Sequence, residues 1–238
     1  MKILKSWLND WIDIETISTD DISEALESLG FEIESRTDKT PNYKNITVGK
    51  VLEIYEHPNA DKVRVTKVDV GSKTYEIVCG AWNFDVGAVV PVALPKSEIK
   101  DGFKIDKRDI RGVESNGMIC SASELDLWDD HAGILKLSDE TKLGSDFSKI
   151  YNSTDTLWEI GVTPNRGDCM SHLGIARELS NYFNLSLKEN SKGLNSNIEN
   201  LIKVNSGKIK ECNSYQSIEI ENFTLGDSNL NIRYRLSS

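Results

Sequence analysis

Two stretches of the sequence carry residue types that suit the phosphates and base edges of a nucleic acid. In HPNADKVR (57–64), Pro58 stiffens a loop, Asn59 can bond to backbone or ligand, and Lys62 and Arg64 can contact phosphate. A turn that satisfies its own polar groups explains Asn59 equally well. In RGVESNGMICS (111–121) the residues that could contact RNA are one cation and two short polar side chains: Arg111, Ser115 and Asn116.

A third stretch, KDGFKIDKRDIR (100–111), has five cations against three aspartates and predicts a small basic stripe. Most charge runs are only solvated faces, so the stripe alone does not establish a binding site. The cations are Lys100, Lys104, Lys107, Arg108 and Arg111. Trp82 could stack on a base, although a lone tryptophan more often packs inside a protein.

The sequence predicts no catalytic centre. His57 precedes a proline, His131 lies in an acidic loop and His172 falls in the first turn of a predicted helix; none has the context of a nucleophile elbow. No glycine-rich loop ends in Lys-Ser/Thr to hold a phosphate. The four cysteines lie 41, 49 and 43 residues apart, which is the spacing of neither a disulfide framework nor a zinc site. We therefore expect no metal or cofactor here.

TPNRGDCMSHLGIARELS (163–180) predicts a strand end, a tight reversal and a capped helix. Pro164 stops the strand, and Asp168 is the predicted N-cap, accepting from the amides two or three residues further on. Apolar residues then follow at helical spacing up to Phe183 and need a partner surface. Asn165, Arg166 and Asp168 are predicted to hold the structure or an interface; for Arg166, contact with a neighbouring domain or subunit is an equal alternative.

Charge is unevenly distributed along the 238 residues. The net charge is −10, but residues 1–39 contain 4 basic and 10 acidic groups, whereas residues 40–150 contain 15 and 18. The overall acidity argues against binding a polyanion, and the nearly balanced middle segment weakens that argument. The cysteines predict a reducing, cytoplasmic environment, and no apolar run is long enough for a membrane span.

Hydrophobic patterning predicts an α+β chain. A helix is expected over 18–29, capped by Ser18 or Thr19, and a strand over 156–164. Between them, five β-rich runs suit a small Greek-key barrel of the oligonucleotide-binding (OB) kind, with a sandwich fragment as the alternative. A short helix and an extended piece are expected within 121–138. The five runs are 46–57, 63–71, 74–81, 88–95 and 103–110.

Burial needs suggest how these elements form domains. Neither flank can cover its own apolar surface, so we expect residues 1–39 and 152–190 to form one discontinuous α/β shell. The five-stranded barrel, residues 40–150, would be inserted into it. After a polar linker, residues 200–238 look like the start of a further α+β domain with an unfinished helix, as if the sequence were cut short.

Several motifs resemble one known family. HPNADKVRVTKVDVG, IVCGAWNFDVGAVVPVALP and IRGVESNGMICSASELDL are similar to the tRNA-binding barrel of bacterial phenylalanyl-tRNA synthetase β subunits. Such barrels also trail some methionyl-tRNA synthetases and occur alone, so they identify only a module. The 163–180 motif is narrower and resembles the segment that follows the barrel in the β subunit. CNSY…IRYRLSS resembles the start of its editing domain, so the resemblance covers essentially the whole chain. Trp82, Phe84 and Asn213–Ser214 depart from the family pattern.

The resemblance implies a role without chemistry in this segment. The parent enzyme would join phenylalanine to tRNA(Phe) using ATP and Mg²⁺, as a heterotetramer of two α and two β subunits with the catalytic core in α. This segment would contribute tRNA contact and subunit architecture. Alternatives are a free-standing tRNA-binding module, or a protein-docking barrel with a vestigial RNA face. The implied tRNA-facing residues are Asn59, Lys62, Arg64, Lys104, Lys107, Arg108, Arg111, Ser115 and Asn116.

Overall fold

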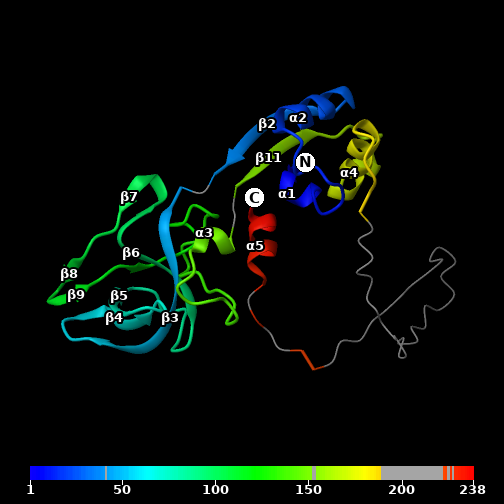
Figure 1. Ribbon diagram of the computed structural model, residues 1–238. Helices are drawn as coiled ribbons and strands as arrows, with labels where there is room; N and C mark the ends of the chain where they lie inside the picture. Colours follow the sequence, from blue (N-terminus) through cyan, green and yellow to red (C-terminus); the bar gives the residue numbers. More distant parts are fainter. Residues whose placement is uncertain (41, 152–153, 189–221, 224–225, 227) are drawn as a thin grey trace.

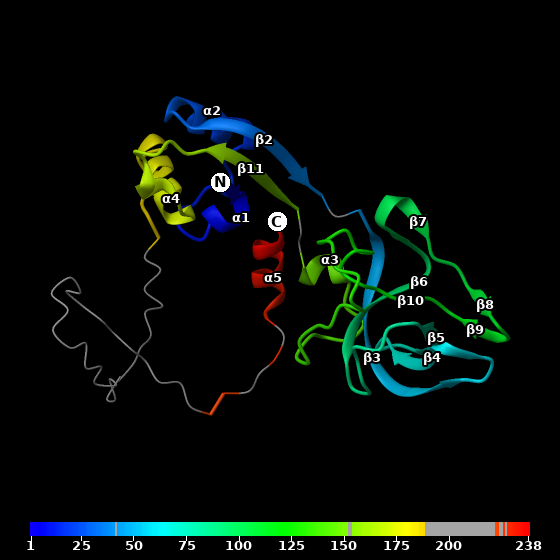
Figure 2. The same cartoon turned by 180° about the vertical axis from the view of Figure 1, so that it is seen from behind.

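The computed structural model describes residues 1–40, 42–151, 154–188, 222–223, 226 and 228–238. Figure 1 shows two bodies side by side, one built from both flanks of the chain and one from its middle, with the C-terminal helix between them. Figure 2 shows the same arrangement from behind. No helix in the described part is both long and apolar enough to cross a membrane.

The first body is built on a three-stranded antiparallel sheet. Strand β11 (Asp155–Gly161) lies between β1 (Lys2–Leu4) and β2 (Glu32–Lys39), so a late segment of the chain forms the centre of an early sheet. Trp158 of β11 pairs with Ile3 on one side and Arg36 on the other. This body is called the shell below.

Three helices cover one face of the shell sheet: α1 (Lys5–Leu8), α2 (Thr19–Ser28) and α4 (His172–Tyr182). The predicted helix is therefore present as α2, with Ser18 as the cap accepting from the Asp21 amide at 3.0 Å. Ile22 and Leu26 of α2 share a fully buried core with Leu179 of α4 and with Trp158. Burial of both apolar stripes against each other stabilises the pairing of the two flanks.

The predicted cap of α4 is wrong. Asp168 lies in a single 3-10 turn, η2 (Gly167–Cys169), and the helix begins later, with Ser171 as N-cap accepting from the Gly174 amide at 3.0 Å. The extra turn arises because Gly174 packs directly on this segment: a Cβ there would meet the Asp168 carbonyl oxygen. The Asp168 carboxylate is thereby left for a side-chain partner, Arg166.

The second body is an antiparallel sheet with strand order β10-β6-β3-β4-β5. Its strands are β3 (Lys44–His57), β4 (Ala60–Asp69), β5 (Thr74–Cys79), β6 (Val89–Ile99), the short β7 (Phe103–Lys104), which pairs with β6, and β10 (Met118–Ile119). A separate hairpin joins β8 (Arg108–Ile110) to β9 (Val113–Ser115). Four of the five predicted β-rich runs are thus strands.

The fifth run, 103–110, is divided between two partners. After β6 the chain turns through η1 (Lys100–Gly102), where Asp101 and Gly102 have φ of 59° and 71°, and pairs back only briefly as β7. It then forms β8 of the separate hairpin. Closure into a barrel is not seen, because none of the sheets among the described residues is closed on itself.

The helix predicted within 121–138 is wrong. Ser121 and Glu124 do form a reciprocal cap, with the Ser121 amide donating to the Glu124 carboxylate at 2.7 Å and the Glu124 amide donating to Ser121 Oγ at 3.2 Å. Asp126 then adopts a φ of 54°, which no α-helix continues, so the segment stays a turn.

Two short helices lie at the junction of the bodies: α3 (Phe147–Ile150) and α5 (Leu230–Ser237) (Figures 1 and 2). Tyr234 of α5 is buried in one core with Phe147, Leu4 of the shell and Leu125 of the second body. The unfinished helix expected near the end of the chain is thus present as α5. The remainder of the further domain expected from residue 200 onward lies mostly outside the described residues.

Candidate nucleic-acid interface

Two turns of the second body are locked together at its edge. The Asn59 side-chain amide donates to the Arg111 carbonyl at 2.9 Å, which joins the β3–β4 turn to the β8–β9 turn. His57 Nε2 donates to the Ile110 carbonyl at 2.8 Å while its Nδ1 accepts from the Asn59 amide at 3.1 Å. Arg111 and Gly112 have φ of 49° and 90°, as a tight two-residue hairpin turn requires. Asn59 and His57 therefore build the edge.

Arg64 is engaged within the fold. Its guanidinium donates to the Ala81 carbonyl at 2.9 Å and the Phe84 carbonyl at 3.2 Å. The same group lies 4.7 Å from the centre of the Trp82 ring and 4.6 Å from that of Phe84. Arg64 thus fixes the loop after β5, and these contacts occupy the guanidinium that was predicted to contact a phosphate.

Ser115 also turns inward. It is buried, accepts from the Val78 amide at 3.0 Å and donates to the Gly117 carbonyl at 3.0 Å. The backbone of Asn116 donates to the Glu76 carbonyl at 2.8 Å, so this segment ties the β8–β9 hairpin to β5. The predicted base-reading role of Ser115 would require breaking these bonds, whereas the Asn116 side chain remains half-buried at the surface.

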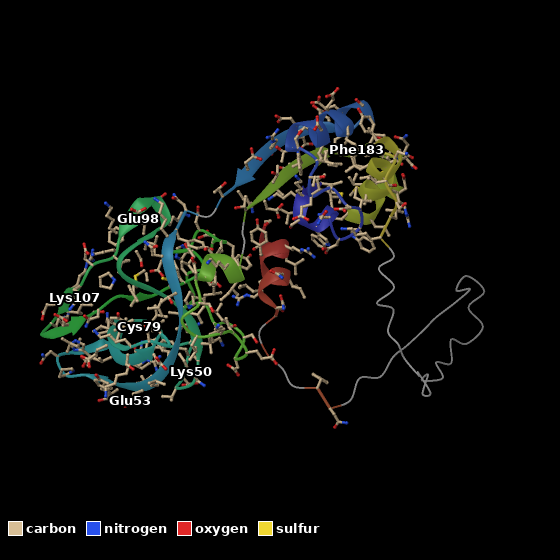
Figure 3. The ribbon with its side chains drawn as sticks, viewed as in Figure 1. Lys50, Glu53, Cys79, Glu98, Lys107 and Phe183 are labelled. Carbon is tan, nitrogen blue, oxygen red and sulfur yellow. The ribbon has the colours of Figure 1, made fainter. Side chains whose placement is uncertain are left out.

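The basic stripe divides into neutralised and open cations. Lys107 pairs with Glu114 at 3.1 Å and Lys100 with Asp126 at 3.0 Å. The other three cations of the stripe, Lys104, Arg108 and Arg111, form no ion pair among the described residues, and Arg111 donates instead to the Asn59 carbonyl at 3.4 Å. We call the exposed Lys104 and Arg108, together with the exposed Lys62 of β4, the open cations. Figure 3 shows the edge that bears Lys107, at the end of the second body away from the shell.

An aromatic side chain interrupts the stripe. Phe103 is 48% exposed, and the Arg108 guanidinium lies 5.2 Å from the centre of its ring. An exposed aromatic residue among cations is a common arrangement in RNA-binding surfaces. Phe103 was not among the residues predicted to contact RNA, although its position inside KDGFKIDKR was the available signal.

A groove opens beside Trp82. It has a volume of about 760 Å³ and lies between the end of β5, strand β10 and the loop 131–134. The Asn83 side chain fixes that loop by donating to the Ile134 carbonyl at 2.9 Å and accepting from its amide at 3.0 Å. Trp82 at the rim is 61% exposed, so it does not serve the core.

The predicted interface motif of the shell forms a closed ionic cluster. Arg166 contacts Asp168 at 3.1 Å, Glu178 at 3.0 Å and Cys169 Sγ at 2.9 Å, with its guanidinium 5.6 Å from the centre of the Phe31 ring. The hydrogen bond from Arg166 lowers the pKa of Asp168. Burial raises the pKa of the Cys169 thiol to about 11. Asn165 is exposed beside this cluster.

Asp168, Cys169 and Glu178 could in principle ligate a metal, since their ligand atoms lie within 4.8 Å of one another. The Arg166 guanidinium already lies among them and supplies the compensating positive charge. A second cation at the same place would be repelled, and the thiol is held protonated. The cluster therefore fits a structural ion pair.

The three histidines have structural partners. His172 accepts from the Leu4 amide at 3.2 Å and stacks on Trp7 at 4.0 Å between ring centres, which joins α4 to the first strand and helix. Burial lowers the pKa of His172 to about 4, so it is neutral at pH 7. His131 contacts Asp129 at 2.9 Å on the surface. None of these contacts activates a nucleophile.

Comparisons with known proteins agree with the motif resemblance. Residues 46–146 match the model of a putative tRNA binding domain. Phenylalanine–tRNA ligase beta subunits are similar to the chain: 45% identical over 75% of it in Burkholderia lata, 43% over 79% in Sulfurimonas denitrificans, and 34% over all of it in Syntrophus aciditrophicus. The chain spans 23, 25 and 30% of these relatives' lengths. The resemblance predicted from the motifs is confirmed.

Proposed function

We propose that this chain, whose sequence places it in the family of phenylalanine–tRNA ligase β subunits, contributes tRNA binding and subunit architecture to such an enzyme. The observation that carries the proposal is the order of the matches. A tRNA-binding domain, residues 46–146, sits inside a chain that is similar to β subunits over 75 to 100% of its length. A free-standing tRNA-binding module does not require the flanking similarity.

The activity of the whole enzyme is part of the proposal. It would join L-phenylalanine to tRNA(Phe) in the cytoplasm, using ATP and Mg²⁺ bound outside this chain, in a heterotetramer of two α and two β subunits. The engagement of His57, His172 and Arg166 in local contacts supports a segment without catalytic chemistry. We expect the isolated chain to show no phenylalanine-dependent ATP–pyrophosphate exchange, and detectable exchange would overturn this division of labour.

The domain plan is proposed on the same basis. Residues 1–39 and 152–190 would form one discontinuous domain, residues 40–150 an OB-type barrel, and residues 200–238 the start of the editing domain. The shared buried core of α2, α4 and β11 supports the first of these, and the strand order of the second body supports the second.

We assign the tRNA-facing surface to the edge that carries the open cations, together with Arg111 and the half-exposed Asn116. These side chains come from β4, from β7, which pairs with β6, and from the β8–β9 hairpin, which the Asn59–Arg111 hydrogen bond joins to the β3–β4 turn. Exposed cations without carboxylate partners can contact phosphates without first breaking an ion pair. This surface is small, so we expect modest affinity in the absence of the rest of the enzyme.

The test is titration of labelled tRNA with the 238-residue chain at about 50 and about 200 mM salt. With about three phosphate contacts, affinity should fall roughly 10- to 50-fold between these concentrations. Absence of binding even at the lower salt would contradict the proposal and favour a protein-docking role, which the net charge of −10 would suit. Binding that does not respond to salt would contradict the phosphate contacts.

A further inference from the structure

We propose that Trp82 is the stacking platform for one unpaired base of the bound RNA, with Lys62 contacting the adjacent phosphate. This inference rests on the proposed tRNA-binding function and adds a subsite to it. It places part of the RNA in the groove beside β5 and β10, beyond the basic edge described above.

The indole ring of Trp82 is both exposed and held in place. Of its surface, 61% is open to solvent, which is unusual for a side chain of this size. The Arg64 guanidinium lies 4.7 Å from the ring centre and is itself fixed by the Ala81 and Phe84 carbonyls. Because one face of the ring is supported in this way, the other can receive a base with little loss of side-chain freedom.

The backbone of Lys62 lies close to the loop that carries Trp82. Lys62 precedes Arg64 by two residues in β4, in the part of the strand where the pairing with β3 shifts between Glu56–Arg64 and His57–Ala60. The Lys62 carbonyl lies 3.9 Å from the position that a Cβ on Gly80 would occupy, which brings Lys62 next to the loop that carries Trp82. Lys62 is exposed and has no carboxylate partner among the residues described.

The groove favours a nucleotide over an apolar protein segment. Its volume of about 760 Å³ is within the range of small-ligand sites, and polar side chains line it together with the indole. The acidic side chain that lines it, Glu124, is already engaged: its carboxylate accepts from the Ser121 amide at 2.7 Å. A single aromatic face beside a free ammonium group suits a base and its phosphate.

The experiment compares tRNA with a blunt RNA duplex as ligands for the full chain and three variants. Trp82→Ala should weaken tRNA binding about tenfold, within the range for loss of one stacked base, and should leave duplex binding unchanged. Its salt dependence should equal that of the wild type, because stacking releases no counterions. Lys62→Ala should instead lower the salt slope by about 1. Tyr182→Ala, which removes an exposed aromatic residue of the shell, is the control and should change neither.

Two results separate failure of this inference from failure of the proposed function. If the wild-type chain binds no tRNA at low salt, the proposed function itself fails. If it binds tRNA and folded Trp82→Ala binds equally well, only the subsite is overturned, and the groove is left for a protein partner. Should Trp82→Ala not fold, ultraviolet crosslinking of wild-type chain to tRNA decides: crosslinked peptides must include Trp82, and their absence refutes the stacking.

Discussion

The shell and the second body differ in whether their cations are paired with acidic groups. In the shell, Arg166 is enclosed by Asp168, Glu178 and the Cys169 sulfur, and its positive charge is compensated on the spot. At the edge of the second body, Lys62, Lys104 and Arg108 are exposed and form no ion pair among the described residues; Glu98, opposite Lys104, is paired with Lys44. A compensated cation holds a fold together, whereas an uncompensated one is available to an external anion.

Local sequence produces this difference. The 163–180 reversal brings Arg166 close to an acid two residues away, and α4 returns a second acid, Glu178, to the same place. In the basic stripe the nearby acids have other uses: the Asp109 carboxylate accepts from the Gly112 amide at 2.9 Å and so stabilises the hairpin turn. The acids of the stripe therefore leave several of its cations uncompensated.

The largest expected effect is a loss of stability of the shell. Trp158 is fully buried at the centre of the sheet, and its Nε1 donates to Ser23 Oγ at 2.9 Å. Trp158→Ala should lower the free energy of unfolding by about 3–5 kcal/mol through lost burial and a cavity. Urea unfolding followed by circular dichroism measures this, with Trp158→Phe as the milder control. A loss below about 1 kcal/mol would contradict the central place of Trp158 in the core.

The second effect is a loss of tRNA affinity on removal of the open cations at the edge of the second body. The triple variant Lys62→Ala, Lys104→Ala and Arg108→Ala should weaken tRNA binding about 10- to 100-fold at low salt and reduce the salt slope by up to about 3. Its thermal stability should stay near that of the wild type, because the three side chains are exposed. The matched control removes three exposed lysines elsewhere, at Lys50, Lys142 and Lys149. Equal losses in both variants would mean that only net charge matters.

A third, smaller effect tests whether the Arg166 ion pairs stabilise the shell without contributing to tRNA affinity. Arg166→Met leaves Asp168 and Glu178 without their cation and should lower Tm by a few degrees, while tRNA affinity stays unchanged. The lowered pKa of Asp168 gives a pH signature: its contribution is present above the ordinary pKa of 3.8 and is lost as pH falls through the folded value. Arg166→Met should lose this acid sensitivity. Weaker tRNA binding by this variant would contradict the prediction that the shell ion pair does not contribute to RNA binding.

The elements were largely predictable because their signals are local. The Ser18 cap with its periodic apolar residues gave α2, and β-branched runs gave four strands. The helix after Ser121 failed because a correct capping pair cannot reveal that Asp126 will leave the helical region. Likewise, the 3-10 turn before α4 depends on the close approach of Gly174 to the Asp168 backbone six residues earlier, which the capping pattern of Asp168 alone does not reveal.

The candidate site was less predictable, because a residue type does not tell which way its side chain turns. Arg64 and Ser115 were reasonable RNA ligands by chemistry, but strand pairing carries both into the fold. Partners distant in sequence decide such cases: Ala81 lies 17 residues from Arg64, and Val78 lies 37 from Ser115. Lys62 near the start of β4 and Lys104 at the end of the short β7 are exposed, as is usual for lysine.

The smallest effect tests whether an ion pair restrains binding at the edge itself. Lys107 is held by Glu114 at 3.1 Å, and both side chains are about 60% exposed, so the pair is weak and competes with phosphate for the same ammonium group. Glu114→Gln keeps the shape but frees Lys107, and we expect about a two- to threefold gain in tRNA affinity with a salt slope steeper by up to about 1. Lys107→Ala, which removes a cation already compensated, should cost less than Lys104→Ala. Titrations of the three variants at two salt concentrations measure this order. If Lys107→Ala and Lys104→Ala weaken binding equally, ion pairing within the chain does not decide which cations reach the RNA.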